Sequence, residues 1–492
     1  MTKKEQTRRD FLVRTSCAAL GAAAASASLK KFGLLTAKAL ESAVNASDPN
    51  YKALVCIFLS GGNDSNNMIV PMAGSLLTAY NTARPAGSGL QLSQGALHPI
   101  TVPGLGQFGL HANLGTTAAN QPDPTKVLHT LWGQQRLAVV CNVGPLVVPL
   151  PNKTAYQSSA NKKPYQLFSH SDQVAQWQTS VSDHVSQTGW GGRTADKTIS
   201  FNVGSGFPLV TSIAGTAAFA QGIQTRPLGI QPAPTALNNI LVLNGFASGQ
   251  TGFNATYSPP RKLSMDFLRT IDRTALLVAA ASDSTEQAVD IGSALSTDPT
   301  IATVFPNSGL ANQLLQVAKV IKIHQGLGVQ RQIFFCQQGG YDTHQDQINN
   351  QGDLFQDLSE AMKAFYDATV ELQLETQVTT FTLSDFGRTL EPSGSGGDVG
   401  TDHGWGNHQF VMGGSVLGGN FYGVPGPSGN VFPTLTLNGP DDTDDRGRWI
   451  PSAAVDQYAA TLATWFGLAP GDLPYVFPNI GHFSTSNLGF MA

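Results

Sequence analysis

The chain has 492 residues, and its 29 Lys and Arg against 33 Asp and Glu give a formal net charge of −4. This acidic balance argues against a nucleic-acid partner, because phosphate binding needs basic patches. The length allows two or three average domains or one large α/β domain with insertions, and the 52 Gly and 28 Pro predict many ordered loops.

The N-terminus has the layout of a twin-arginine (Tat) signal peptide, which we assign to residues 1–39. Arg8 and Arg9 stand just before an apolar pair, and an alanine-rich stretch follows at 17–29. That stretch is shorter than the roughly 20 residues of a membrane span. The preferred cleavage site follows Ala37-Lys38-Ala39, with Ala25-Ser26-Ala27 as the alternative. The signal predicts export of the folded chain by the Tat translocase to a periplasmic or extracellular location. The alternative is a cytosolic protein with an accidental arginine pair.

Removal of this segment would change the charge of the chain. Residues 1–39 hold 8 of the 29 basic and 2 of the 33 acidic side chains, so 21 basic and 31 acidic ones would remain, a net charge of −10. No later apolar run is long enough for a transmembrane helix, so no integral membrane span is expected after signal removal.

The first predicted element after the signal is a buried strand at 51–59, an apolar run stopped by Gly61-Gly62-Asn63-Asp64. Further strands are predicted at 136–142, 331–337 and 376–383, with an amphipathic helix at 353–375 between the last two. Strand, helix and strand form a βαβ unit. The predicted fold is therefore an alkaline-phosphatase-like α/β/α sandwich with a mostly parallel sheet.

The middle of the chain, 195–330, is predicted to be an insertion or helical cap within one domain of residues 50–492. It contains a strand-like piece at 238–243 and helices at 264–282 and 310–326. A last helix is predicted at 453–467. We find no internal repeat.

Cysteine usage predicts no disulfide. Cys56, Cys141 and Cys336 each lie in or at the end of an apolar run and have no metal-site spacing, so we expect small buried hydrophobic side chains. Cys17 lies in the signal segment.

Three polar clusters follow predicted strands or lie close by, where open parallel sheets bind ligands. Carboxylate and imidazole side chains are a usual ligand set for zinc, manganese or iron. Each cluster could also be a structural turn with local hydrogen bonds, and an isolated Asp-x-His is more often structural. The candidate ligands are Asp64 in 61–67, Asp342 and His344 in 339–347, and Asp402, His403 and His408 in 400–414.

A fourth cluster, 167–172, opens a predicted helix with two serines. Ser169 or Ser171 can simply cap the helix, and either can serve as a nucleophile at the helix end. Asp385 can be a further ligand or the acceptor for a histidine N–H. The acidic stretch at 441–445 can bind calcium or form a solvated loop.

Together these motifs resemble an exported family called domain of unknown function 1501. The resemblance runs almost end to end. It is carried by the Tat signal, GGNDSNNMIVP (61–71), LFSHSDQ (167–173), GWGGR (189–193), GGYDTH (339–344), SDFGRT (384–389), GTDHGWGNHQFVMGG (400–414) and RGRWIPSAAVDQY (446–458). The family is in turn similar to the alkaline phosphatase and sulfatase superfamily.

The superfamily resemblance implies a two-metal site. Asp64, Asp402 and His403 would hold one metal, and Asp342, His344 and His408 the other. Two departures from the superfamily pattern stand out: Asp342 and His344 are unusually close, and His408 follows the Asp-His pair unusually soon. His482 is the alternative last ligand.

The same resemblance implies a nucleophile at a helix start, which would be Ser169, with Ser171 and Ser65 as alternatives. The function implied is a metal-dependent hydrolase of small-molecule phosphate or sulfate esters. Its cofactors would be two divalent ions, zinc first and manganese, iron or calcium as alternatives. The rival is a non-catalytic envelope protein that keeps the fold for binding or assembly. A metal-dependent oxidoreductase is a weaker rival, because the chain has no Rossmann glycine pattern and no iron–sulfur cysteine set.

Overall fold

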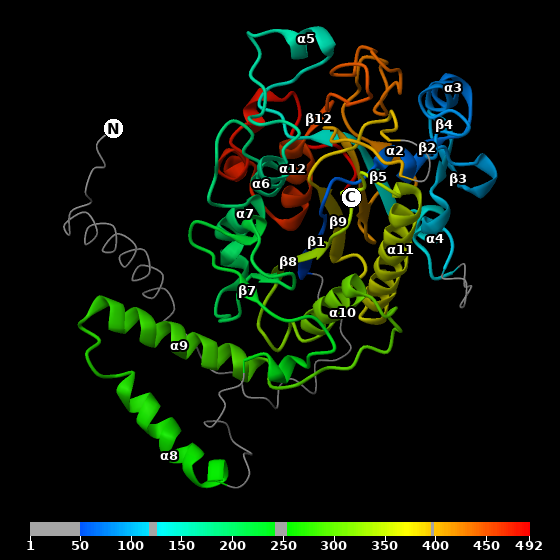
Figure 1. The fold of residues 1–492 in the computed structure, drawn as a ribbon. Helices are drawn as coiled ribbons and strands as arrows, with labels where there is room; N and C mark the ends of the chain where they lie inside the picture. Colours follow the sequence, from blue (N-terminus) through cyan, green and yellow to red (C-terminus); the bar gives the residue numbers. More distant parts are fainter. Residues whose placement is uncertain (1–49, 118–124, 242–252, 395–397) are drawn as a thin grey trace.

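The computed structural model describes residues 50–117, 125–241, 253–394 and 398–492 (Figure 1). The predicted signal peptide, 1–39, lies outside these residues. Within the described part, no helix is long and apolar enough to cross a membrane.

The core of the molecule is a nine-stranded, mostly parallel sheet. Eight strands follow the order β11-β5-β10-β9-β1-β8-β6-β7, and β12 pairs with β5. At its centre β1 (Lys52–Leu59) lies parallel between β8 (Arg331–Gln338) and β9 (Val378–Ser384). These three strands confirm the predicted ones at 51–59, 331–337 and 376–383. They bring the loops that follow them to one edge of the sheet.

The remaining strands extend this sheet on both sides. They are β5 (Leu137–Gly144), β6 (Val210–Ser212), β7 (Leu228–Gly229), β10 (Asn407–Met412), β11 (Phe421–Tyr422) and β12 (Ala453–Ala454). Only β10 runs antiparallel to its neighbours, β5 and β9. A separate antiparallel sheet joins β2 (Ile69–Pro71), β4 (Gly106–Leu110) and β3 (His98–Val102).

Helices cover both faces of the main sheet, because its strands are apolar on both sides. Val55 and Ile57 of β1 pack into a core with α10 (Gly309–Lys322), α11 (Gln347–Glu371) and α4 (Leu128–Gly133). Leu54 and Cys56 point to the opposite core, with α7 (Trp190–Thr198), α6 (His170–Thr179) and α12 (Val455–Phe466). The predicted α/β/α sandwich is therefore confirmed.

The segment 195–330 contributes to the sheet as well as to a projection. β6, β7 and α10 belong to the main sheet and its covering layer. By contrast, α8 (Phe253–Leu268) and α9 (Leu276–Ala294) extend away from the body in Figure 1. The single helix predicted at 264–282 is wrong, since Asp272 adopts a left-handed backbone with φ of 55° and the chain turns between the two helices. The strand-like piece predicted at 238–243 is also wrong over its described part, where 237–239 form a 3₁₀ turn.

Shorter helices lie in the connections, namely α2 (Ser65–Met68), α3 (Gly74–Ala83), α5 (Lys153–Gln157) and α13 (Leu473–Val476). Cys56, Cys141 and Cys336 are buried and unpaired, as predicted.

Candidate metal centre

The loops that follow β1, β8 and β9 meet at the carboxyl end of the sheet. Gly61, with φ of +117°, lets the first two loops touch, because a Cβ at this position would lie 2.3 Å from the backbone nitrogen of Asp342. The Gly61 amide donates to Asp385 Oδ1 over 2.9 Å. Ser384 joins the end of β9 to β1 and its loop. The Ser384 hydroxyl accepts from the Asn63 amide (2.9 Å) and donates to the Leu59 carbonyl (2.6 Å).

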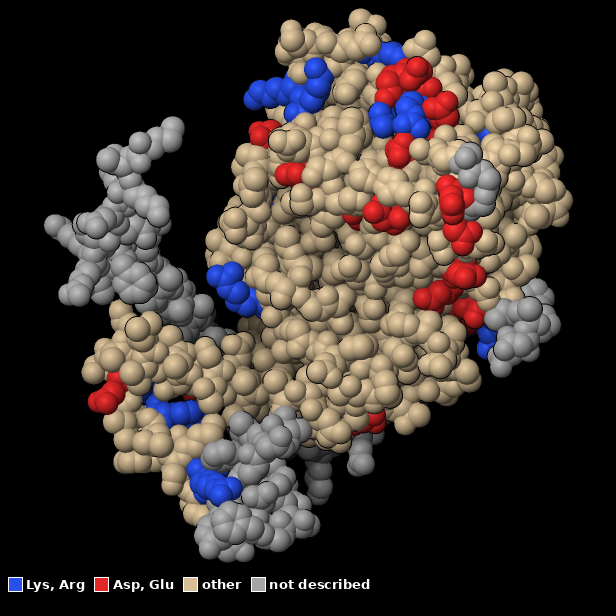
Figure 2. All heavy atoms as spheres, viewed as in Figure 1, with Lys and Arg blue, Asp and Glu red and all other residues tan. Residues whose placement is uncertain are grey.

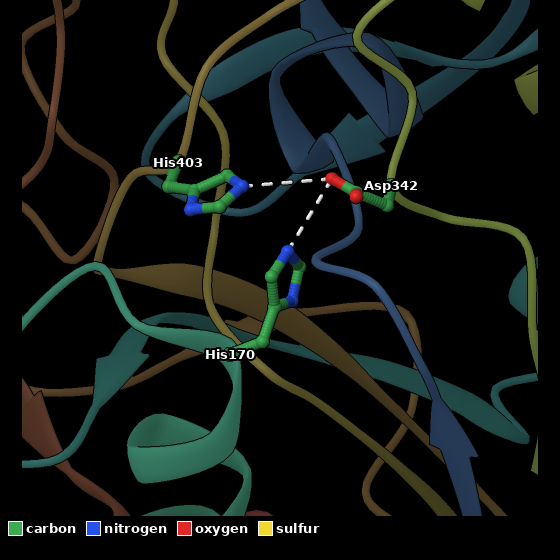
Figure 3. A group of neighbouring side chains, drawn as sticks. All are labelled: His170, Asp342 and His403. Atoms are coloured by element: carbon green, nitrogen blue, oxygen red, sulfur yellow. Dashed lines mark ion pairs between the residues drawn. The ribbon is translucent and has the colours of Figure 1, made fainter.

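Three side chains from distant parts of the chain converge beside this junction. His170 opens α6, Asp342 follows β8, and His403 precedes β10. One ligand atom from each lies within 4.8 Å of the other two (Figure 3). Asp342 Oδ1 is 3.4 Å from His170 Nε2 and 3.5 Å from His403 Nε2. Atoms bound to one ion at about 2 Å are separated by about 3.3 Å in a tetrahedral shell, so these two separations fit a shared ion.

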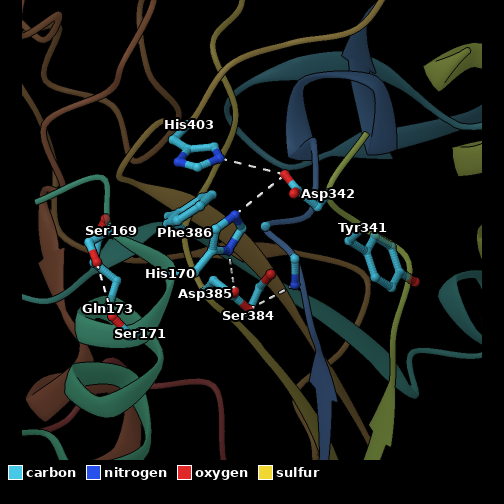
Figure 4. A network of polar contacts seen from close by, with 12 residues as sticks. Ser169, His170, Ser171, Gln173, Tyr341, Asp342, Ser384, Asp385, Phe386 and His403 are labelled. Carbon is cyan, nitrogen blue, oxygen red and sulfur yellow. Dashed lines mark hydrogen bonds and ion pairs between the residues drawn. The ribbon is translucent and has the colours of Figure 1, made fainter. Parts of the chain in front are cut away.

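Hydrogen bonds fix the orientation of both imidazoles. His170 Nδ1 lies 2.8 Å from Asp385 Oδ2 (Figure 4), and His403 Nδ1 lies 2.8 Å from the Phe168 carbonyl oxygen. Both partners are acceptors, so each Nδ1 carries the proton and each neutral ring turns the lone pair of Nε2 toward Asp342. Of the two roles left open for Asp385, a metal ligand or an acceptor for a histidine N–H, the structure shows the acceptor.

This arrangement suits a bound cation. His170 Nε2 is buried and makes no hydrogen bond. A cation between the imidazole nitrogens and the carboxylate would be stabilised by all three groups, in addition to the charge that Arg388 already offers Asp342. Phe386 packs against both rings, with centroids 4.7 Å from His170 and 4.6 Å from His403, which holds them in place.

The protonation states agree with this reading for His403 and Asp342. Burial lowers the pKa of His403. Burial would raise the pKa of Asp342, but the hydrogen bond and charge of Arg388 outweigh it, and the pKa lies below its ordinary value. The hydrogen bond that His170 donates to Asp385 raises the pKa of His170, so a metal would compete with a proton for this ring.

His344 and Asp402 lie at the edge of the group. His344 Nε2 is 3.0 Å from Asp342 Oδ1 and 3.0 Å from His403 Nε2, and its Nδ1 is 3.6 Å from Asp402 Oδ1. Asp402 Oδ2 is held by Arg446 at 2.5 Å. Four of the six predicted ligands, Asp342, His344, Asp402 and His403, are thus brought together, but as one cluster rather than two.

A buried arginine, Arg388, holds the cluster in place through its contacts with Asp342 and the neighbouring loops. Arg388 pairs with Asp342 and donates to the Gly61 carbonyl (2.9 Å), the Gly62 carbonyl (3.0 Å) and the Thr401 carbonyl (2.7 Å). It therefore ties Asp342 to the loop after β1 and to the segment that carries His403.

Asp64, predicted as a ligand of the first metal, is placed elsewhere. Its fully buried carboxylate pairs with Arg84 at 2.8 Å, accepts from Gln347 at 2.6 Å, and caps α2 through the Asn66 amide. Both oxygens are thereby engaged, and Asp64 is not in the ligand group found among the described residues.

His408, predicted as a ligand of the second metal, lies inside β10. Its Nδ1 accepts from the Asn142 amide over 3.0 Å, and its ring lies 4.8 Å from that of Phe432. Burial lowers its pKa to about 3, so it is a neutral core histidine. The alternative, His482, bonds the Val147 carbonyl at 2.7 Å and is not in the ligand group either.

The predicted nucleophile does not face the cluster. Ser169 precedes α6, and its hydroxyl donates to Asp172 over 2.6 Å. Figure 4 shows it on the far side of Phe386 from Asp342. Ser171 also bonds Asp172, at 3.2 Å, and Ser65 is buried in α2. The position between the two serines, His170, is the one that reaches the site. His170 was not among the predicted site residues, although one of the two roles considered for Asp385, the acceptor for a histidine N–H, was a usable signal.

The acidic loop at 441–445 is also different from either expectation. Asp442 is buried and accepts from the backbone amides of Asn438, Gly447 and Arg448 at 2.9–3.0 Å. Asp441 is buried and accepts from Thr434. These carboxylates accept hydrogen bonds from backbone amides of the loop, so their role is to stabilise the loop structure.

Comparison with known proteins gives a family match over part of the chain and several distant structures, among them the following two. A search of curated proteins finds no match. Among solved structures, the crystal structure of Ps i-CgsB in complex with k-i-k-neocarrahexaose is 10% identical with a TM-score of 0.32, covering 87% of this chain and 77% of the other. A TAB5 alkaline phosphatase mutant with Mg bound in its M3 site is 10% identical with a TM-score of 0.23, covering 74% and 90%. Residues 266–431 match the family described as protein of unknown function (DUF1501), so the resemblance predicted from the motifs is confirmed over that segment.

Proposed function

We propose that this protein is an exported, metal-dependent hydrolase of phosphate or sulfate esters. The observation that carries the proposal is the convergence of His170 Nε2, Asp342 Oδ1 and His403 Nε2 at the carboxyl end of the sheet. Two imidazoles and one carboxylate leave coordination positions open for water and an ester oxygen, as catalytic sites require.

The ligand atoms limit which metals the site would bind. Two nitrogens and one oxygen suit zinc, manganese or iron, whereas calcium prefers a shell of oxygens. The cluster supports one ion rather than two, because Asp342 and His403 belong to the same group. Bound there, a divalent ion would supply Lewis-acid activation of water and of the ester.

The protein side chains would divide the remaining tasks. Asp385 and the Phe168 carbonyl hold the two imidazoles, and Arg388 holds Asp342. His344 is the most exposed imidazole of the cluster, with 44% of its side chain accessible. It would carry a proton between solvent and the leaving oxygen. Water would be the attacking group, since the Ser169 hydroxyl is bonded to Asp172.

The test is hydrolysis of p-nitrophenyl phosphate and p-nitrophenyl sulfate by purified protein with its metal content measured. We expect one ion per chain and turnover of one ester. H170A should lose both the metal and at least about 100-fold in kcat/KM, as expected for a lost ligand. S169A should stay within threefold of the wild type. H184A, a matched control, removes an exposed histidine that pairs with Asp183 beyond the other end of α6.

The results also separate the rival functions. Bound metal without turnover of any ester would favour the non-catalytic binding protein. Loss of turnover in S169A with the metal retained would restore the serine as nucleophile and contradict attack by water.

A further inference from the structure

The projecting helices α8 and α9 carry an unusual amount of exposed apolar surface. We call residues 260–294 the helical arm. Of the fifteen large hydrophobic side chains that are exposed in the described part of the chain, seven lie in the arm. Leu263, Phe267, Leu268 and Leu277 are 71%, 66%, 65% and 72% exposed. Such a concentration on a soluble surface marks a contact site.

A wide-open hollow of about 910 Å³ also lies between the two helices of the arm. On the α9 side small side chains, Ala281, Ser282 and Thr285, leave this space open, while Met265 and Leu268 line it from α8. The two helices therefore do not bury their facing surfaces against each other. They leave room for side chains from another helix.

The charges of the two helices are opposite. The α8 side, residues 260–273, carries four basic and two acidic residues, whereas α9 (Leu276–Ala294) carries three acidic and no basic ones. Asp283, Glu286 and Asp290 are spaced three and four apart, which places them along one side of α9. The basic residues of the α8 side are Arg261, Lys262, Arg269 and Arg273, and blue atoms mark this projection in Figure 2.

We propose that the helical arm is a homodimer interface in which α8 of one chain packs on α9 of a second copy. A two-fold axis makes the contact self-complementary, because each chain offers a net basic segment, residues 260–273, and an acidic helix, α9. Within one chain, Lys262 and Arg269 pair with Asp266, and Arg273 pairs with Asp283, so the dimer contact would add to or replace these pairs. Two hairpins together form a four-helix bundle, which buries the exposed leucines and fills the hollow. An anionic membrane is a poorer occupant, since it would attract α8 but repel the acidic side of α9.

Sedimentation equilibrium of the purified chain tests this assignment. We expect the mass of two chains at micromolar concentration. L263E with L268E should weaken the dimer at least 100-fold, with an unchanged far-ultraviolet circular dichroism spectrum as the sign of intact folding. V304E, which alters a side chain 75% exposed outside the arm, is the matched control and should stay dimeric.

Charge reversal tests the pairing of α8 with α9. K262E with R269E should weaken the dimer, and the addition of E286K with D290K should restore it. A wild-type chain that stays monomeric at 100 μM would overturn the proposal. A monomer that sediments with phosphatidylglycerol vesicles would overturn it too, by assigning the arm to a membrane. Loss of the dimer in V304E would show that the interface lies elsewhere.

Discussion

At the scale of single residues, the candidate centre depends on one carboxylate oxygen. Asp342 Oδ1 faces His170, His344 and His403 within 3.5 Å and also pairs with Arg388. The arginine keeps the carboxylate ionised, while oxygens behind two of the imidazoles keep their lone pairs turned inward. The candidate site therefore relies on residues that would not touch a bound ion.

Asp385 offers the sharpest test of that dependence. D385N keeps the shape of the side chain but removes the charge behind His170. We expect metal affinity to fall about 10- to 100-fold, the usual cost of losing such a partner. Competition with a chelator measures it. D172N, which alters only the carboxylate that accepts from Ser169 and Ser171, is the control, and an unchanged affinity in D385N would contradict the role assigned to Asp385.

Asp64 separates a structural role from metal binding. D64N leaves the buried Arg84 charge without its partner and should destabilise the fold by about 3–5 kcal/mol. Urea unfolding measures this loss, and the metal content of the folded fraction should stay that of the wild type. Loss of the metal at an unchanged unfolding midpoint would instead make Asp64 a ligand.

Much of the candidate site is predictable from the sequence, but not that its residues form one cluster instead of two. Asp342 and His344 follow a strand that sequence periodicity locates well, whereas Asp402 and His403 lie in the loop before β10. All four residues come together because these loops meet at one edge of the sheet. Asp64 also follows a strand, but the direction of its side chain depends on Arg84, twenty residues away, which no local pattern reveals. His170 was not predicted because the two serines beside it drew attention first. A serine before a helix is a common cap or nucleophile, so the histidine between the serines was not considered.

At the scale of helices and strands, the predictions are most accurate for the buried strands and least accurate for the middle of the chain. The strand at 136–142 and the helix at 310–326 correspond to β5 and α10 within a few residues. The helix predicted at 353–375 is α11, which begins earlier, at Gln347. The prediction missed this start because the first turn of the helix is polar and has no apolar periodicity. The turn between α8 and α9 rests on the left-handed Asp272, and apolar periodicity alone does not report such a break.

The helix α12 carries a buried acid that makes stability depend on pH. Burial raises the pKa of Asp456 from an ordinary 3.8 to about 7. Between these values the folded chain keeps a proton that the unfolded chain releases, so the free energy of unfolding falls as pH rises from about 4 to 7. The full effect is at most about 4 kcal/mol.

The variant D456N should remove this dependence. The difference in unfolding free energy between D456N and the wild type should be constant below pH 4, change in favour of the variant between pH 4 and 7, and be constant above. Urea titrations across that range measure it. A difference that does not vary with pH would contradict a buried neutral Asp456.

At the scale of the whole molecule, the apolar strands are covered on both faces and the polar loops gather at one edge. The sheet and its layers followed from alternating strand and helix patterns. The projection of the helical arm could not be predicted, because a single sequence does not show whether an amphipathic helical hairpin projects or packs against the rest of the chain.

Export also belongs to this scale and remains a prediction. R8K with R9K should leave the chain in the cytoplasm of a bacterial host, because twin-arginine signals are read as arginines and not only as charge. Immunoblots of periplasmic and cytoplasmic fractions measure the distribution. K3R with K4R is the matched control. Equal periplasmic amounts of R8K with R9K and wild type would contradict the Tat assignment.

The central claim is that His170, Asp342 and His403 hold one metal ion. Anomalous diffraction from crystals of the natively loaded protein tests it most directly. The account predicts one peak at about 2.0–2.2 Å from His170 Nε2, His403 Nε2 and an oxygen of Asp342. A peak coordinated by Asp64 or His408, or no peak in protein loaded with excess zinc and manganese, would contradict it.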